Sequence, residues 1–221
     1  MLRALRERRH AVIGAGRLSR TYAVLTGRDD AIEEQLEVVR RFYDEPPREK
    51  RVIGFKTKVS DVWDLASLKE ILESRHVRAI VMVRRNLVKL ATSHLTAGRL
   101  HARTGAWNVQ NEEARTGPQE FSVEEFDRML RRVVFDDALL RAYSEYLDAR
   151  RLVVEYEDLL RDRNAWLQSI LEFLEAAPQP LDSSITKNTD DDLRTALVNF
   201  DQIRRHYAGT PFAPMFDERI N

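Results

Sequence analysis

The fold of this chain is decided by one stretch, Ala79-Ile80-Val81-Met82-Val83-Arg84-Arg85-Asn86-Leu87-Val88-Lys89-Leu90-Ala91-Thr92-Ser93. Its short apolar run, rich in β-branched residues, predicts a buried strand over residues 79–83. Asn86 can cap a helix that begins after it, because apolar residues follow at helical spacing. The Arg85 guanidinium is then expected at the carboxyl edge of a strand and beside a helix N-terminus, with Ser93 about two turns along that helix. Ligands bind at such edges of open α/β sheets and anions at helix N-termini, so the stretch predicts a phosphate site.

Outside this stretch, apolar runs alternate with amphipathic segments. We expect strands over 11–13, 52–56, 79–83 and 152–156, and helices over 2–9, 29–44, 61–74, 122–149, 158–176 and 190–207 as well as after Asn86, with an irregular tail over 209–221. Strands separated by helices indicate a parallel arrangement. We therefore predict an α/β fold with a mostly parallel central sheet flanked by helices, in a single domain that spans residues 1–221.

The composition excludes several classes of protein. The 221 residues include 36 Lys plus Arg and 36 Asp plus Glu, so the formal net charge is zero and binding to nucleic acid through bulk charge is not expected. The chain has no cysteine, which suits a reducing compartment. No apolar run approaches the ~20 residues that span a bilayer, and residues 1–9 are too charged for a signal peptide. We therefore expect a cytoplasmic protein without a membrane span.

The pair Arg85-Asn86, with Ser93 eight residues after the arginine, resembles the 3′-phosphate-binding motif of sulfotransferases that use 3′-phosphoadenosine 5′-phosphosulfate (PAPS). The resemblance implies a three-layer fold like that of P-loop NTPases, with PAPS as co-substrate and no metal. It also implies that Arg85 and Ser93 bind the 3′-phosphate. Taken alone, the same residues fit an ordinary strand-to-helix junction with a solvated arginine pair.

Further stretches resemble the same family, in particular its bacterial Stf0-like and nodulation-sulfotransferase members. Residues 152–160, with Tyr156-Glu157-Asp158 at their centre, are similar to a turn whose tyrosine lies near the adenine, which implies that role for Tyr156. The alternative is that Asp158 caps a helix while Tyr156 packs in the core. Residues 101–107 and 181–188 also resemble these enzymes, and Lys187 is the candidate nucleotide-binding cation there, against the alternative of a solvated loop lysine.

Lys56 and Lys58 are the candidate catalytic residues. They follow the expected strand over 52–56, where some relatives carry Lys-Thr-His with the histidine as base, and Lys58 stands in that place. Lys56 would stabilise charge on the sulfuryl group during transfer. Lysine acts as a base near neutral pH only when its pKa is lowered, and both side chains also fit a solvated strand end.

The N-terminal part departs from the family. The loop that wraps the 5′-phosphosulfate in these enzymes is not found intact. The segment 14–21 is one degenerate candidate. In the alignment we prefer, the chain starts one strand and one loop late, and Arg17 replaces the carboxylate that serves as base in the Stf0-like enzymes. The sequence therefore also fits a catalytically inactive, truncated protein that binds a nucleotide or a partner, and the loss of a central strand would favour a homodimer.

The remaining expectations concern other kinds of chemistry and the acceptor. A kinase-like enzyme that uses the segment 14–21 is a third reading of the chain. The five histidines show no metal-ligand spacing, so no metal site is predicted. A small-molecule or carbohydrate acceptor is expected in a pocket built from residues 16–30 and 101–120, where Trp107 is either a packing residue or part of the acceptor site.

Overall fold

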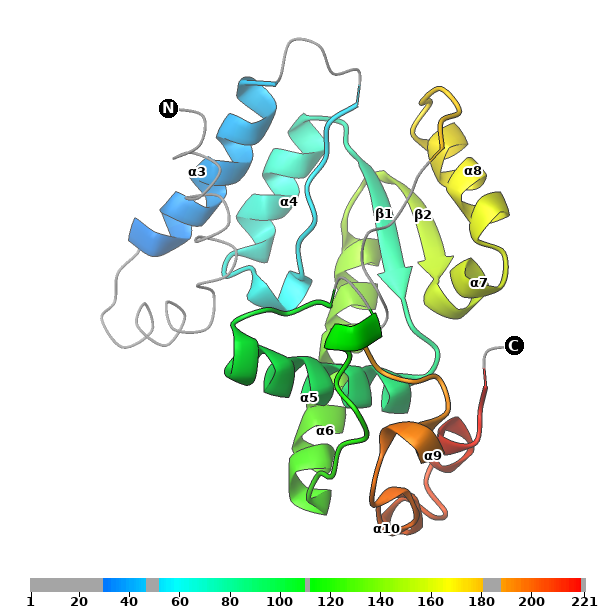
Figure 1. Cartoon of the computed structure of the whole chain (residues 1–221). Helices are drawn as coiled ribbons and strands as arrows, with labels where there is room; N and C mark the ends of the chain where they lie inside the picture. Colours follow the sequence, from blue (N-terminus) through cyan, green and yellow to red (C-terminus); the bar gives the residue numbers. More distant parts are fainter. Residues whose placement is uncertain (1–29, 47–51, 110–111, 181–187, 220–221) are drawn as a thin grey trace. The chain divides into compact units, whose positions relative to one another are not determined.

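A computed structural model of the chain describes residues 30–46, 52–109, 112–180 and 188–219 (Figure 1). Its helices and strands are α3 (Asp30–Asp44), α4 (Leu65–Ser74), β1 (Arg78–Val83), α5 (Leu87–Thr104), α6 (Val123–Tyr146), β2 (Arg150–Glu155), α7 (Tyr156–Arg161), α8 (Arg163–Phe173), α9 (Leu193–Ala196) and α10 (Phe200–His206), with 3-10 turns at η1 (Val59–Asp61), η2 (Glu112–Ala114) and η3 (Ala213–Phe216). The described part is thus a mixed α/β structure.

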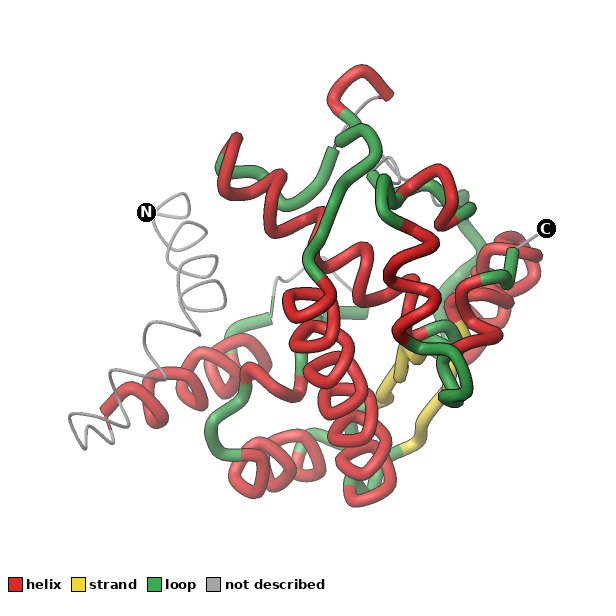
Figure 2. Tube along the Cα trace, turned by 90° about the horizontal axis from the view of Figure 1, so that it is seen from below, coloured by secondary structure: helices red, strands yellow, loops and turns green. Residues whose placement is uncertain are grey.

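Strands β1 and β2 form a two-stranded sheet, and they run in the same direction side by side (Figures 1 and 2). Along β1 the buried residues alternate with exposed ones, with Val81 and Val83 buried and Ile80 and Met82 exposed. This period of two is the pattern of a strand that buries one face. The predicted strands over 79–83 and 152–156 are therefore confirmed, each within two residues of its predicted start and one of its predicted end.

The chain forms two compact units, and both strands and α6 contribute residues to each. The first unit comprises residues 1–81, 138–152 and 172–176. Its core gathers the apolar faces of α3 and α4 with the last turns of α6, and its buried members are Leu36, Val59, Val62, Leu68, Ile71, Leu72, Tyr143 and Leu147. Asp64 caps α4 by accepting a hydrogen bond from the Ser67 amide at 2.9 Å, which satisfies one of the free donors of that helix end.

The second unit comprises residues 82–137, 153–171 and 177–221. Its core joins α5 and the first turns of α6 to α9, α10 and η3, and its fully buried aromatic side chains are Phe121, Phe126 and Phe216. Phe216 lies in the tail that was predicted to be irregular, where the turn η3 places it against the ring of Tyr207 with centroids 5.7 Å apart. The C-terminal tail is thus part of this core.

Three predicted elements differ from the structure. Residues 52–56 pair with no strand in the described part, and Phe55 packs edge-on against Phe42 instead. The helix predicted over 158–176 is interrupted at Asp162, which leaves the helical conformation and caps α8 through the Ala165 amide. The helix predicted over 190–207 is interrupted at Leu197, whose extended backbone pairs with Gln119.

Several predictions fall on residues outside the described part. These are the helix over 2–9, the strand over 11–13, the candidate loop 14–21, most of the acceptor segment 16–30 and the lysine at position 187. The single domain over residues 1–221 also stays a prediction. None of the described helices is long and apolar enough to cross a membrane.

Two phenylalanines on α6 test the core of the second unit. Phe126 is fully buried whereas Phe135 is 65% exposed. We expect Phe126→Ala to lower the free energy of unfolding by about 3–5 kcal/mol, because a large ring is lost from a packed site, and Phe135→Ala to change it by less than about 0.5 kcal/mol. Denaturant titration followed by circular dichroism measures both, and equal effects would contradict the assigned core.

Candidate functional site

Asn86 fixes the turn between β1 and α5. Its side chain is fully buried, and its carbonyl oxygen accepts a hydrogen bond from the Lys89 amide at 2.8 Å, which caps the helix. Its amide group donates to the Met215 carbonyl and to the Glu218 carboxylate, each at 2.7 Å. The predicted capping role is therefore confirmed, and the same side chain also ties the C-terminal tail to the start of α5.

Glu157 lies at the turn between β1 and α5, where the sequence analysis predicted a phosphate site. This fully buried carboxylate, in the first turn of α7, accepts hydrogen bonds from the backbone amides of Arg85 at 3.1 Å and of Asn86 at 3.2 Å. These two amides precede the positive end of the α5 dipole, where a negative charge is favoured. The chain thus supplies its own anion to these two amides of the β1–α5 turn, and they are not available to an external phosphate.

The Arg85 guanidinium, 39% exposed, lies between two carboxylates. It forms an ion pair with Glu155 and a two-pronged pair with Asp158, with the shorter nitrogen–oxygen distance at 2.8 Å. The hydrogen bonds between Asp158 and Arg85 hold the pKa of Asp158 below its usual value and the pKa of Arg85 above its own. An incoming phosphate would have to compete with both carboxylates for this guanidinium.

Arg84 packs against Tyr156. Its guanidinium carbon lies 4.0 Å from the centroid of the tyrosine ring, which is a cation–π contact. The Arg84 Nε atom is buried and has no hydrogen-bond partner, and burial lowers the pKa of Arg84. An unpaired donor on a buried cation is costly. Of Arg84 and Arg85, it is Arg84 that has a donor without an acceptor.

Lys89 adds a third cation near the start of α5. Its side chain is only 5% exposed and pairs with Asp191 at 3.1 Å. Buried charges are stable only when they are paired, so this contact attaches the segment before α9 to α5.

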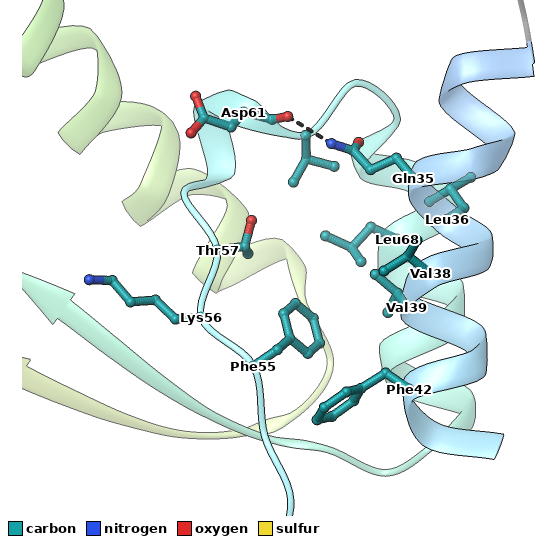
Figure 3. Close-up of a pocket in the computed structure, with 11 residues that line it drawn as sticks. Gln35, Leu36, Val38, Val39, Phe42, Phe55, Lys56, Thr57, Asp61 and Leu68 are labelled. Carbon is teal, nitrogen blue, oxygen red and sulfur yellow. Dashed lines mark hydrogen bonds between the residues drawn. The ribbon is translucent and has the colours of Figure 1, made fainter. Parts of the chain in front are cut away.

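The other predicted residues lie elsewhere. Ser93 is half-buried on α5, in the same unit as Arg85 and Tyr156. Lys56 and Lys58 are exposed and belong to the other unit. Lys56 borders an apolar cavity of about 160 Å³ between α3 and residues 55–57, and its ammonium group points away from the neighbouring Phe55 and Phe42 rings (Figure 3). Arg85 and Tyr156, by contrast, both lie at the carboxyl ends of the neighbouring strands β1 and β2.

Trp107 is 57% exposed, and its ring stacks on that of His101 with centroids 4.0 Å apart. It is therefore not a core residue, and the acceptor role considered for it stays a prediction. The part of the chain that the structure describes holds no group of three or more histidine, aspartate or glutamate side chains placed to bind a metal ion.

The sequence analysis did not predict the roles of Arg84, Glu157 and Lys89. Each contacts a residue distant in the chain, since Glu157 bonds to amides more than 70 positions away and Lys89 to a carboxylate 102 positions away.

The chain is similar to nodulation protein H of Rhizobium tropici, with 26% identity over 189 residues, which cover 83% of this chain and 73% of that protein. No family model matches the chain, and no solved structure matches it. The similarity supports a sulfotransferase-like family, in line with the resemblance described from the motifs.

Replacing the buried carboxylate tests its structural role. We expect Glu157→Gln to lower the free energy of unfolding by about 1–3 kcal/mol, because one of the two amides would face an NH2 group instead of an acceptor. Glu120→Gln, which alters an exposed carboxylate of the same unit, should have almost no effect. Denaturant unfolding of both variants gives the comparison, and a Glu157→Gln variant as stable as the parent would rule out the assigned hydrogen bonds.

The pKa of Asp158 tests the Arg85 pair. Because this pKa is lowered in the folded protein, the pair stabilises the fold above the ordinary aspartate value near 4, and that contribution is lost as the pH falls through the lowered value. Carbon-detected NMR titration should show the pKa rising in Arg85→Ala and rising less in Arg161→Ala, whose arginine makes a single contact to Asp158 at 2.8 Å. A larger rise in Arg161→Ala would refute the assignment.

Proposed function

We propose that this protein is a sulfotransferase that moves a sulfuryl group from PAPS to a hydroxyl group of a small-molecule or carbohydrate acceptor. The observation that carries the proposal is the position of Arg85-Asn86 at the carboxyl end of β1, with Ser93 on the following helix. The similarity to nodulation protein H over most of the chain supports it. We further propose that the complete fold is a three-layer arrangement like that of P-loop NTPases.

In this proposal Arg85 and Ser93 bind the 3′-phosphate of the nucleotide, and Tyr156 contacts its adenine. The residues present fit such a ligand in two respects: a guanidinium fork matches a phosphate, and Arg84 has a buried donor without a partner. Binding requires a rearrangement, since Arg85 must leave Glu155 and Asp158. Adenine must stack on the ring face of Tyr156 that Arg84 does not cover, or displace Arg84. Lys187 would add a further cation.

The chemistry is an in-line transfer. The acceptor oxygen forms a bond to sulfur while the bond from sulfur to the 5′-phosphate oxygen breaks, and the hydroxyl proton passes to a base. Lys56 would stabilise the charge on the transferring group, and Lys58 stands where some members of the family carry a histidine base. Both side chains are exposed in the structure. Their proposed roles therefore require a bound substrate that contacts them.

A second candidate is a protein of the same family that binds a nucleotide or a partner without catalysis. The observation in its favour is the pairing of Arg85 with two carboxylates. These carboxylates neutralise the charge of Arg85 without a ligand. Under this reading the motif holds β1 against β2 and α7, and phosphate binding is weak or absent.

Calorimetric titration with 3′-phosphoadenosine 5′-phosphate distinguishes the two candidates at their first step. We expect binding that weakens about tenfold to a hundredfold in Arg85→Ala, because charge-assisted hydrogen bonds to the phosphate are lost. Asp158→Asn should strengthen binding, because it removes a competitor for the guanidinium. Glu120→Gln, which removes an exposed charge elsewhere in the unit, serves as the control for Asp158→Asn.

Incubation with PAPS and a panel of hydroxyl acceptors then measures transfer as the release of 3′-phosphoadenosine 5′-phosphate. Acceptor-dependent release supports the enzyme, whereas binding without release supports the non-catalytic candidate. Absence of nucleotide binding by the folded protein would refute the proposed sulfotransferase and leave the partner-binding form of the second candidate.

A further inference from the structure

Lys89 lies on α5 between the two residues to which the proposed function assigns the 3′-phosphate. It follows Arg85 by four positions and precedes Ser93 by four. Residues four apart share one face of a helix, so Lys89 and Ser93 lie one turn apart on the same face of α5. Because Cα–Cβ bonds in a helix tilt toward its N-terminus, the Lys89 side chain extends from this face toward the turn that carries Arg85.

The ammonium group of Lys89 is a buried cation with a single carboxylate as its partner. The side chain is 5% exposed, and among the described residues its acceptor is Asp191, at 3.1 Å. An ammonium group has three donors, so two of them are left for a further acceptor. A buried ion pair with unmet hydrogen bonds adds little to stability, so packing alone does not explain a lysine at this position.

Asp191 also acts on a second cation, Arg84. Burial lowers the pKa of Arg84, whereas Tyr156, Glu157 and Asp191 act to raise it. Glu157 already accepts hydrogen bonds from two backbone amides. Asp191 is therefore the counterion that Lys89 and Arg84 have in common, and Arg84 lies over the ring assigned to the adenine.

Asp191 is the member of its pair with Lys89 that a ligand can displace. Its side chain is 27% exposed, against 5% for that of the lysine. A phosphate monoester carries a charge of about −1.5 to −2 and three strong acceptor oxygens. It can therefore satisfy the donors of Lys89 that one carboxylate leaves unmet, and it forms stronger charge-assisted hydrogen bonds than neutral groups do.

We propose that Lys89 is a specificity-determining residue of the nucleotide site, and that it exchanges Asp191 for the 3′-phosphate when the nucleotide binds. This inference rests on the proposed function and adds to it a third phosphate-binding residue and an internal competitor. A nucleotide without a 3′-phosphate cannot replace Asp191 at Lys89, so the exchange favours the 3′-phosphorylated nucleotide.

Calorimetric titration of the full chain with two nucleotides tests the role of Lys89. They are 3′-phosphoadenosine 5′-phosphate and adenosine 5′-phosphate, which lacks the 3′-phosphate, and the ratio of their Kd values measures the discrimination. Lys89→Met keeps an unbranched side chain and removes the ammonium group. We expect it to weaken binding of the first nucleotide about tenfold to a hundredfold, because a charge-assisted hydrogen bond is lost, and to leave binding of the second nearly unchanged.

Asp191→Asn tests the competitor. It leaves Lys89 charged and removes the carboxylate that the phosphate must displace. We expect it to strengthen binding of 3′-phosphoadenosine 5′-phosphate about three- to tenfold and to change binding of adenosine 5′-phosphate by less. A purely structural ion pair would give no gain in affinity when it is broken.

Two further variants serve as controls. Lys69→Met removes the lysine of another lysine–carboxylate pair, which Lys69 forms with Glu73 at 2.7 Å in the first unit, and it should change neither affinity. The double variant with Lys89→Met and Asp191→Asn leaves no unpaired carboxylate, so it should fold as stably as the parent and still discriminate poorly.

Three results would overturn the inference. They are full discrimination in a folded Lys89→Met variant, unchanged or weaker binding of 3′-phosphoadenosine 5′-phosphate in Asp191→Asn, and recovery of the parental discrimination in the double variant. The last result would assign the defect of Lys89→Met to its unpaired carboxylate.

The same titrations separate this inference from the proposed function. Binding that is lost in Arg85→Ala but not in Lys89→Met removes the inference and leaves the proposed function standing. Binding that depends on Lys89, without acceptor-dependent release of 3′-phosphoadenosine 5′-phosphate from PAPS, supports the inference and refutes the transfer. Absence of nucleotide binding by the folded parent overturns both.

Discussion

A single buried carboxylate organises the carboxyl end of the sheet. Glu157 accepts the amides of Arg85 and Asn86, so it joins the turn after β1 to the helix after β2. Two backbone donors in a buried turn must be satisfied, and a carboxylate satisfies both at once while complementing the helix dipole. These hydrogen bonds hold the backbone of the turn at Arg85 and Asn86, from which the Arg85 side chain extends.

The same constraint explains why the two arginines differ. Arg85 emerges beside Glu155 and Asp158 and is neutralised by them, whereas Arg84 lies over Tyr156 with an unpaired nitrogen. Ion pairs at an exposed site contribute little net stability, so the Arg85 pairs are weak competitors for a multiply charged ligand. In the proposed function, separating the Arg85 ion pairs to bind the 3′-phosphate therefore has a modest cost.

Local patterns predicted the elements, and long-range contacts decided what local patterns left open. The apolar run over 79–83 and the cap at Asn86 could be read directly, because alternation and capping depend on neighbours in the chain. The interruption at Leu197 could not, since Leu197 leaves its helix to pair with the distant Gln119. In the site, Arg85 and Tyr156 were predicted from motifs, while Glu157 was missed because its partners lie more than 70 positions away.

The hydrogen bonds of Asn86 limit how this protein can diverge. Its NH2 group donates to the Met215 carbonyl and the Glu218 carboxylate, and an aspartate there would set one carboxylate against another in a buried position. Homologues of this chain with aspartate at position 86 should therefore have lost the acid at position 218, so the two positions should covary across the tail and the motif.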